Sequence, residues 1–390
     1  MLKDKHLVLI GAGHAHVEVL RAFGRRPVSG LQLTLITREV DTPYSGMLPG
    51  HIAGHTTAAE MLIDTRPLAR FAHARLVQDD VTGLDLDGRR VLCRGGPPVA
   101  YDILSINIGS RPTTAAVPGA AEHALPVKPL DGFLPRFEAL RTRVLAGRSR
   151  RILLVGAGAG GVELLLAAEH RLRHDLAAAG GDAAGLSFTL VAAGADILPG
   201  FPAAFRTRLR AILAARGIAV EAGARVVAVE AHGVTLSGTP PRRLPADEVL
   251  WATEAAPAAW LAESGLLLDA QGFVRVDAML RATGREEVFA AGDTIAFDPG
   301  PIPRSGVYAV RAGAVLADNI RAQATGGQLR PFRPQRDALY LLSTGPREAI
   351  GTRNGLVAGG AWAWWLKDWI DRRFIRRFRD LPPPGRLSGG

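Results

Sequence analysis

The chain has 390 residues, a formal net charge of +10 and 47% hydrophobic residues, with 45 glycines and 26 prolines. This composition excludes a disordered chain and is typical of a glycine-rich α/β protein with two or three domains. No run reaches the roughly 18 apolar residues that a spanning helix needs, so no transmembrane segment is predicted. An apolar strand begins near Leu7, too early for a secretory signal to precede it, so the cytoplasm is the expected location.

Cys93 is the only cysteine. Chemistry through a redox-active disulfide needs two thiols, so that mechanism is excluded within one chain. Cys93 is interpreted as a small apolar residue on a strand. The positive charge suits nucleic acid, anionic lipid or nucleotide cofactors. Because the basic residues are mostly scattered arginines without a nucleic-acid motif, no nucleic-acid binding is predicted, and no metal site is predicted either.

The first 24 residues predict a strand, a glycine turn and a helix. The apolar residues 7–10 have the length and β-branching of a buried parallel strand. Gly11 and Gly13 follow, and a helix is expected to end near Gly24. Free N–H groups at such a helix start bind anions, most often a dinucleotide pyrophosphate. His16 replaces the third glycine of the G-x-G-x-x-G pattern, so an ordinary strand-turn-helix is the alternative.

The same arrangement returns in the middle of the chain. Residues 151–155 predict a second buried strand, and Gly156, Gly158 and Gly161 supply all three glycines of the pattern. Two such units predict two dinucleotide sites rather than two sets of packing glycines. Ala192, at the end of the unit's second strand, offers no carboxylate to an NAD ribose, and no arginine cluster follows for a 2′-phosphate. NADH is favoured over NADPH.

Between the two units, the ribose position and one loop are informative. Arg38 and Glu39 follow the strand at residues 31–36, so the adenosine ribose is contacted by Glu39 or in another way. Residues 42–51 combine turn formers with apolar side chains. They are expected to lie over a flat ring or to form a surface loop.

A carboxylate stands at the end of a late apolar strand. In Val288-Phe-Ala-Ala-Gly292-Asp293, Asp293 is placed to accept hydrogen bonds from the ribityl hydroxyls of a flavin; an ordinary aspartate turn is the alternative. The two glycine turns upstream favour the flavin. Residues 306–322 predict a helix whose first N–H groups could stabilise negative charge on a reduced flavin ring.

Residues 331–390 predict a third part, with strands, a hairpin turn at Asn354-Gly355 and a helix over residues 361–379. The helix has a ridge at i, i+4 spacing, made of Trp362, Leu366, Ile370, Phe374 and Phe378. It is flanked by Lys367, Arg372, Arg373, Arg376, Arg377 and Arg379. Aromatic and basic side chains together predict a helix on an anionic membrane surface. Packing on its own sheet or in a dimer interface is the alternative, and the tail from Leu381 is expected to be disordered.

These motifs together resemble the FAD-dependent pyridine nucleotide oxidoreductases, specifically the type II NADH dehydrogenase-like proteins, from residue 7 to about residue 378. Within them the chain looks most like the flavoprotein module fused ahead of selenide, water dikinase, and a stand-alone version of it is implied. The segments that carry this likeness are Gly11-Ala-Gly-His-Ala-His16, Thr42-Pro-Tyr-Ser-Gly-Met-Leu-Pro-Gly50, Ser105-Ile-Asn-Ile-Gly-Ser110, Ser305-Gly-Val-Tyr-Ala-Val-Arg311 and Trp365-Leu-Lys-Asp-Trp-Ile-Asp371.

The resemblance implies an α/β fold with two Rossmann-like dinucleotide-binding domains, the first of them discontinuous, and a C-terminal β-hairpin and helix region. The FAD-binding domain would comprise residues 1–115 and 265–330. The NAD(P)H-binding domain would comprise residues 116–264, and the C-terminal region residues 331–390.

The resemblance also implies the site residues. FAD would be bound by residues in or beside the quoted motifs: Gly11, Gly13, His14, Arg38, Pro43, Leu48, Val81, Gly109, Gly292, Asp293, Val307 and Tyr308. NAD(P)H would be bound by Gly156, Gly158 and Gly161. Glu163 is the implied catalytic residue, close to where the nicotinamide meets the flavin.

Two positions depart from the type II dehydrogenases. Arg311-Ala-Gly313 stands where those proteins carry an alanine-glutamine signature near the quinone, and Thr253-Glu254 replaces a threonine-glycine pair. The first departure concerns the acceptor, and the second concerns the approach of the nicotinamide.

Three hypotheses follow. The first is an enzyme that passes hydride from NAD(P)H to FAD and then electrons to a second acceptor, with a quinone at the inner face of the cytoplasmic membrane favoured. The second is a soluble NAD(P)H-dependent reductase for a protein or a selenium compound, with the terminal helix as a docking face and a homodimer allowed. The third is a nucleotide-binding scaffold without turnover, suggested by His16, Ala192 and Glu254.

Overall fold

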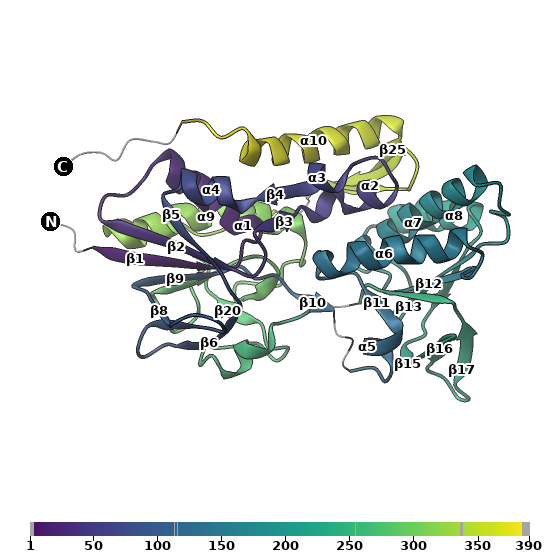
Figure 1. Cartoon of the computed structure of the whole chain (residues 1–390), viewed down its shortest axis with the longest axis horizontal. Coiled ribbons are helices and arrows are strands. Elements are labelled where there is room, and N and C mark those ends of the chain that lie inside the picture. Colours follow the sequence, from purple (N-terminus) through teal and green to yellow (C-terminus); the bar gives the residue numbers. More distant parts are fainter. Residues whose placement is uncertain (1–3, 113, 115, 254, 336–337, 384–390) are drawn as a thin grey trace.

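The computed structural model describes residues 4–112, 114, 116–253, 255–335 and 338–383. Glu254 and the last residues of the predicted disordered tail, 384–390, lie outside them. Two five-stranded parallel sheets lie side by side, and the C-terminal helix runs along the elements of the first one (Figure 1). This is the predicted fold class.

The first sheet has the order β21-β9-β1-β2-β5, and every pairing in it is parallel. Its strands are β1 (Lys5–Ile10), β2 (Leu31–Thr37), β5 (Ala74–Gln78), β9 (Ile103–Ile106) and β21 (Val288–Ala290). Residues 7–10 are completely buried in its centre, which explains their uninterrupted apolar run. Because β21 returns from far along the chain to pair with β9, the first domain is discontinuous, as predicted.

Helices α1 (His14–Arg25), α4 (Thr65–Phe71) and α9 (Gly306–Thr325) pack on this sheet and on one another. Helices α1 and α9 approach closely at Gly313, where an added Cβ would lie 2.9 Å from the Cβ of Glu18. A larger residue at position 313 would push the two helices apart.

The second sheet is also parallel throughout, in the order β11-β18-β12-β13-β14. Its strands are β11 (Ala124–Pro126), β12 (Arg151–Val155), β13 (Ser187–Ala192), β14 (Ile218–Ala222) and β18 (Glu248–Trp251). Helices α6 (Leu130–Leu145), α7 (Ala159–Ala178) and α8 (Ala203–Ala215) accompany it. Helix α7 ends in an alanine- and glycine-rich stretch of the sequence, residues 177–185.

Small sheets and short helices complete the two domains. Two three-stranded antiparallel sheets consist of β6 (Val81–Asp85), β7 (Arg90–Cys93) and β8 (Val99–Ala100), and of β15 (Val226–Glu230), β16 (Gly233–Leu236) and β17 (Arg242–Pro245). The two-stranded pairs are β3 (Asp41–Pro43) with β4 (Leu62–Asp64), β10 (Arg111–Pro112) with β19 (Ala255–Ala256), and β20 (Val274–Val276) with β22 (Ile295–Phe297). The short helices are η1 (Ser45–Met47), α2 (Leu48–Ile52), α3 (Ala58–Met61), α5 (Ala120–His123), η2 (Ala259–Glu263) and η3 (Gly292–Thr294).

The C-terminal region is a three-stranded antiparallel sheet followed by helix α10 (Ala361–Arg379). Its strands are β23 (Tyr340–Ser343), β24 (Ala349–Arg353) and β25 (Leu356–Gly360). Asn354 and Gly355 both have positive φ, +51° and +77°, so the predicted two-residue hairpin turn is confirmed. Helix α10 packs on this sheet and also on β4 of the first domain (Figure 1).

The ridge predicted on α10 is wrong in its C-terminal half. Phe374 and Phe378 are 7% and 2% exposed because they face the first domain. The exposed stripe is instead formed by Trp362, Trp365 and Trp369, which are 53–57% exposed, and continues into Arg373 and Arg376. Several of the predicted flanking cations bond to the protein on the inner face of the helix. Arg377 pairs with Glu18, and Arg372 pairs with Glu60 and Asp368. Arg379 donates to backbone oxygens. Among the described helices, none is long and apolar enough to cross a bilayer.

Candidate active site

Three glycine turns meet at the carboxyl edge of the first sheet. Gly11 follows β1, Gly109 follows β9 and Gly292 follows β21, with φ of +84°, +69° and +74°. Parallel strands end on the same edge, and this edge is where open α/β sheets bind their ligands. The structure therefore brings three of the predicted FAD-binding residues together.

The side chain of Asn107 connects these turns. Its Nδ2 donates to the carbonyl of Ala291 at 2.7 Å, and its Oδ1 accepts from the backbone N–H of Ala15 at 3.1 Å and of His16 at 3.3 Å. A Cβ added at Gly13 would overlap this Oδ1, and one added at Gly292 would lie 2.5 Å from Nδ2. Glycine is thus required at both positions by close approach to one buried amide.

His16 occupies the third-glycine position in a specific way. Its Nδ1 lies 2.6 Å from the carbonyl oxygen of Gly11, and its Nε2 lies 2.8 Å from Oγ of Ser105. Burial lowers the pKa of His16 to about 4, so the ring is neutral at pH 7. The departure from the glycine pattern is therefore a packed and hydrogen-bonded residue of the turn.

His14 begins α1 beside the loop at residues 42–51. Its ring centroid lies 5.3 Å from that of Tyr44 and 6.3 Å from that of Phe374, and burial lowers its pKa to about 4. One ring nitrogen bonds to the backbone of Pro43, whereas Nε2 is buried and has no hydrogen-bond partner among the described residues. Since a carbonyl only accepts, Nε2 is left as an acceptor for a hydroxyl or amide donor of a ligand.

The loop itself is tied to the glycine turn. The Oγ1 of Thr42 donates to the carbonyl of Ala12 at 3.0 Å, and Leu48 is buried at the start of α2. Pro43 ends β3, next to His14. This segment is therefore packed against the turn and does not form a loose surface loop.

Arg38 and Val81 lie at the other side of the same edge. Arg38 follows β2, with its Nε 3.1 Å from Glu39 Oε1, and its carbonyl accepts from the side chain of Gln78. Val81 begins β6, shortly after β5 ends. The predicted FAD residues thus extend along the edge from β21 to β5.

Asp293 and the start of α9 close the opposite end. The Oδ2 of Asp293 lies 3.0 Å from Nζ of Lys128 and 3.4 Å from Oγ of Ser110. Val307 and Tyr308 stand in the first turn of α9, and the Tyr308 hydroxyl donates to the carbonyl of Gln335. A small cavity of about 10 Å³ lies between Asp293 and this turn.

These residues fit FAD. The buried Nε2 of His14 has no partner among the described residues, which leaves a polar atom for a ligand. A Cβ at Gly109 would meet no atom within 4 Å, so space remains beside that turn. A glycine turn, a free polar atom and a carboxylate are groups that a dinucleotide with a ribityl chain needs.

The second glycine turn shows the full pattern. Gly156 has φ of +116°, and a Cβ there or at Gly161 would overlap a backbone carbonyl, of Ala252 and of Gly156 respectively. Nothing lies within 4 Å of a Cβ built at Gly158. Two glycines thus permit tight packing, and the third leaves room for a ligand at the start of α7.

Glu163 lies where the two domains and the C-terminal region meet. Its Oε1 accepts from the backbone N–H of Ser343 at 2.7 Å and lies 3.8 Å from Nζ of Lys367. Burial raises the pKa of Glu163 to about 7, although Lys367 opposes the shift. A carboxyl group of this kind can give or take a proton near neutral pH.

Lys367 links Glu163 to the first domain. Its Nζ donates to the carbonyl of Gly46 at 2.6 Å and to Asp371 at 2.8 Å. Burial would lower the pKa of Lys367, but Asp371 and Glu163 outweigh it and raise that pKa. Burial and Asp371 likewise raise the pKa of Tyr44. The result is a line of polar groups from α7 to the loop beside His14.

Sequence reasoning missed most of the partners of the predicted residues. Lys367 and Asp371 were counted only as part of the terminal helix, although their i, i+4 spacing predicts an ion pair. Asn107 is an amide at the end of an apolar strand, where an unpaired polar group is costly, and this was the available signal. Nothing local in the sequence points to Lys128 or Ser343, because their contacts join distant segments.

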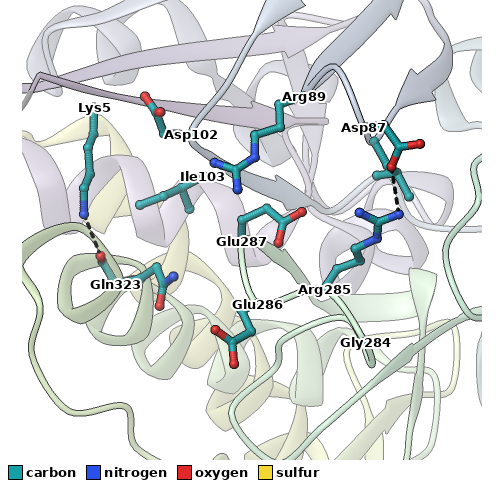
Figure 2. A pocket seen from close by; sticks show the side chains of 11 residues that line it. Lys5, Asp87, Arg89, Asp102, Ile103, Gly284, Arg285, Glu286, Glu287 and Gln323 are labelled. Carbon is teal, nitrogen blue, oxygen red and sulfur yellow. Dashed lines mark hydrogen bonds and ion pairs between the residues drawn. The ribbon is translucent and has the colours of Figure 1, made fainter.

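An open hollow lies elsewhere, at the amino edge of the first sheet. It measures about 620 Å³ and is lined by residues at the amino ends of β1, β9 and β21, among them Lys5, Asp102 and Glu287. Figure 2 shows Lys5 donating to the backbone of Gln323, and Arg285 paired with Asp87. It contains none of the predicted site residues and mixes both signs of charge.

Comparisons with known proteins show the family of the chain. Residues 5–313 match the family described as pyridine nucleotide-disulphide oxidoreductase. The chain is 29% identical to the demethylphylloquinone reductase NdbB of Synechocystis over 291 residues, 72% of this chain and 68% of that protein. It is 24% identical to the type II NADH:quinone oxidoreductase of Staphylococcus aureus over 393 residues, 96% of each chain.

The fold is shared with a solved structure, that of NDH2 from Plasmodium falciparum in complex with NADH. The TM-score is 0.80 at 14% sequence identity, over 97% of this chain and 98% of that one. The narrower likeness to the module fused to selenide, water dikinase stays a prediction. The chain belongs to the pyridine nucleotide-disulphide oxidoreductase family, as an FAD-dependent NADH dehydrogenase-like protein.

Proposed function

We propose that this protein oxidises NADH and reduces a quinone that it meets at an anionic membrane surface. The acceptor is suggested by the relatives named as quinone reductases. The proposal also divides the chain into three parts. These are an FAD-binding domain of residues 1–115 and 265–330, an NAD(P)H-binding domain of residues 116–264, and a C-terminal region of residues 331–390. Bound FAD would supply the redox chemistry by accepting hydride from NADH and passing two electrons on.

The residues of the two edges would hold the cofactors. The three glycine turns, His14 and Asp293 would bind FAD, together with Arg38, Val81 and the start of α9. Gly156, Gly158 and Gly161 would bind NADH. Glu163 would be the catalytic residue, because it stands on the helix that begins at the NADH turn.

The observation that carries the proposal is the buried carboxyl of Glu163 beside Lys367. A quinone takes up two protons with its two electrons, so its reduction needs a proton source that is shielded from bulk water. Glu163 is 14% exposed, and its pKa of about 7 lets it be protonated or ionised at working pH. Lys367 and Asp371 would hold it in place.

The experiment compares a proton-taking acceptor with one that takes none. In purified holoprotein, Glu163→Gln is expected to lower the NADH:quinone rate by roughly 10²-fold, within the usual range for a general acid. NADH oxidation by ferricyanide, a one-electron acceptor that needs no proton, should stay within about twofold. Steady-state rates with both acceptors give the ratio directly.

Glu138→Gln is the matched control, because Glu138 is an exposed carboxylate on α6 that pairs with Arg141. It should leave both rates unchanged. Equal losses of both rates in Glu163→Gln would contradict a proton role, and ferricyanide turnover without any quinone turnover in the wild type would favour a soluble reductase.

The outer stripe of α10 supports the membrane part of the proposal. Trp362, Trp365 and Trp369 present amphipathic rings, and Arg373 and Arg376 add charge on the same side. Aromatic rings at headgroup level beside arginines suit an anionic interface. The inner face is fixed to the protein by ion pairs, so the stripe keeps its orientation.

Vesicle flotation tests this part separately. Wild type is expected to float with vesicles of phosphatidylcholine and phosphatidylglycerol, and much less with phosphatidylcholine alone. The double variant Trp365→Glu/Trp369→Glu should stay at the bottom with either vesicle. Leu267→Glu is the matched control. Leu267 is also an exposed apolar residue, and its carbonyl accepts from the N–H of Arg275 in β20, which lies on the opposite side of the first domain from α10 (Figure 1). Equal flotation of the stripe variant and wild type would remove the membrane claim.

A further inference from the structure

Lys128 connects the two domains at the proposed flavin site. It follows β11 of the second sheet, yet its Nζ lies 3.0 Å from Oδ2 of Asp293, which follows β21 of the first sheet. Asp293 is 16% exposed, so this carboxylate is mostly withdrawn from water. Lys128 of the second domain thus places a positive charge at the ligand-binding edge of the first sheet.

The neighbouring residues indicate that the ammonium group of Lys128 lies beside the proposed FAD-binding turns. The same Oδ2 of Asp293 is reached by Oγ of Ser110, and Oγ1 of Thr294 donates to the carbonyl of Gly109. The charges of Asp293 and Lys128 also act in opposite directions on the pKa of His14, the first residue of α1, so both groups lie close to that helix start. Lys128 therefore stands beside the turn that would contact the flavin.

The choice of lysine is itself informative. Only four of the 47 basic residues in the sequence are lysines, at positions 3, 5, 128 and 367. Two of them, Lys128 and Lys367, stand at the proposed active site. An ammonium group is a compact point charge that can turn between acceptors, whereas a guanidinium group is planar and prefers paired acceptors.

We propose that Lys128 is a positioning residue for FAD that the second domain supplies to the first. It orients the Asp293 carboxylate for the ribityl hydroxyls, and it places a positive charge beside the negative charge that bound FAD gains on two-electron reduction. This inference rests on the proposed FAD site and not on the identity of the acceptor.

A cation near the site should stabilise reduced FAD more than oxidised FAD, because only the reduced form carries the additional charge. Removing the charge should therefore weaken the binding of reduced FAD about tenfold more than that of oxidised FAD. For a two-electron couple, a tenfold change in this ratio lowers the midpoint potential by about 30 mV. Because Lys128 is partly exposed, a larger effect is not expected.

The test uses holoprotein without any quinone. Lys128→Met and Lys128→Arg are titrated spectroelectrochemically against a reference dye, and the dissociation constant of oxidised FAD is measured by fluorescence. Lys128→Met should lower the midpoint potential by about 30 mV, and Lys128→Arg should restore most of it. Lys5→Met is the matched control, because it removes an ammonium from the amino edge of the same sheet (Figure 2). It should leave the potential unchanged.

The outcomes separate the possible roles. If Lys128→Met lowers the thermal midpoint of unfolding and leaves the flavin midpoint potential unchanged, the ion pair only stabilises the contact between the two domains, and the inference is wrong. If Lys128→Met binds no FAD, the Lys128→Arg variant decides. A flavin midpoint potential equal to that of wild type would support the role of the positive charge, and a Lys128→Arg protein that binds no FAD would refute it. A wild-type protein that binds no FAD would refute the proposed function as well. A wild-type protein that binds FAD but does not reduce quinone would contradict the proposed acceptor and leave this inference unchanged.

Discussion

The two glycine turns of this chain have the same order of strand, turn and helix but are packed in opposite ways. In the turn between β12 and α7, Gly161 lies against the carbonyl of Gly156, and no side chain fits between helix and strand. In the turn between β1 and α1, the equivalent position carries His16, whose ring bridges Gly11 and Ser105. Helix α1 is connected to the sheet by side-chain hydrogen bonds, and α7 by direct backbone contact.

This difference shows what the third glycine is for. A strand, a turn and a helix form without it at the first turn. It is needed only where the helix backbone touches the turn. Where the helix lies further from the turn, a side chain must fill the space between them. A buried side chain with polar atoms needs a hydrogen-bond partner for each of these atoms. Ser105, Asn107 and the Gly11 carbonyl provide these partners.

The sharpest test is to give the first turn the glycine that the pattern demands. His16→Gly should destabilise the protein by about 4 kcal/mol, because it leaves a cavity, an unpaired Ser105 hydroxyl and a glycine inside a helix. FAD should be lost before NADH, for which we propose the other turn as the binding site. Urea denaturation, with FAD release followed by fluorescence, measures both effects.

His174→Gly is the control for this variant. His174 lies in α7 and is exposed, so the same exchange should cost only about 0.5 kcal/mol of helix propensity. If His16→Gly were as stable as His174→Gly, the ring of His16 would not be part of the packing of the first turn.

The reverse exchange should harm the second turn. Gly161→Ala places a Cβ against the Gly156 carbonyl, so α7 must move, at a cost of about 3 kcal/mol. NADH binding, followed by quenching of tryptophan fluorescence, should weaken at least tenfold while FAD stays bound.

Gly158→Ala separates packing from ligand contact in the same turn. A Cβ at position 158 meets nothing within 4 Å, so folding should be unaffected, and only the approach of NADH should suffer. Equal stability of the two alanine variants would show that α7 does not need its close contact.

The sequence predicted most of the framework, because it is carried by local patterns. Buried strands, glycine turns and the hairpin at Asn354-Gly355 each depend on a few neighbouring residues, and they appear where the pattern put them. The partial failure concerns α10. Its ridge was derived from i, i+4 spacing alone, but the side of a helix that faces the protein depends on what lies opposite, here Tyr44 and Glu18.

The site was less predictable for the same reason. Glu163 was identified from a motif, but its raised pKa comes from burial under β23 and α10, which follow about 180 residues later. The Lys128–Asp293 pair spans 165 positions and both domains. Such contacts exist only after the chain has folded, and no spacing rule in one sequence reveals them.

The smallest expected difference between the turns appears on acidification. Burial lowers the pKa of His16 to about 4, whereas a histidine in an unfolded chain titrates near 6.5. Between these values the unfolded chain binds a proton that the folded chain does not, so the stability due to His16 is lost as the pH falls through this window. The slope approaches about 1.4 kcal/mol per pH unit for each such group.

His16→Gln removes this titration and keeps a polar side chain, so it should be less stable than wild type at pH 7.5. Its disadvantage should shrink by about 2 kcal/mol between pH 6.5 and pH 5, because only wild type loses the His16 contribution there. His14, with its similarly lowered pKa, titrates in both proteins and cancels from the comparison. Urea midpoints at pH 5.0, 6.5 and 7.5 give the two slopes, and parallel slopes would mean that the His16 ring is not held neutral in the folded turn.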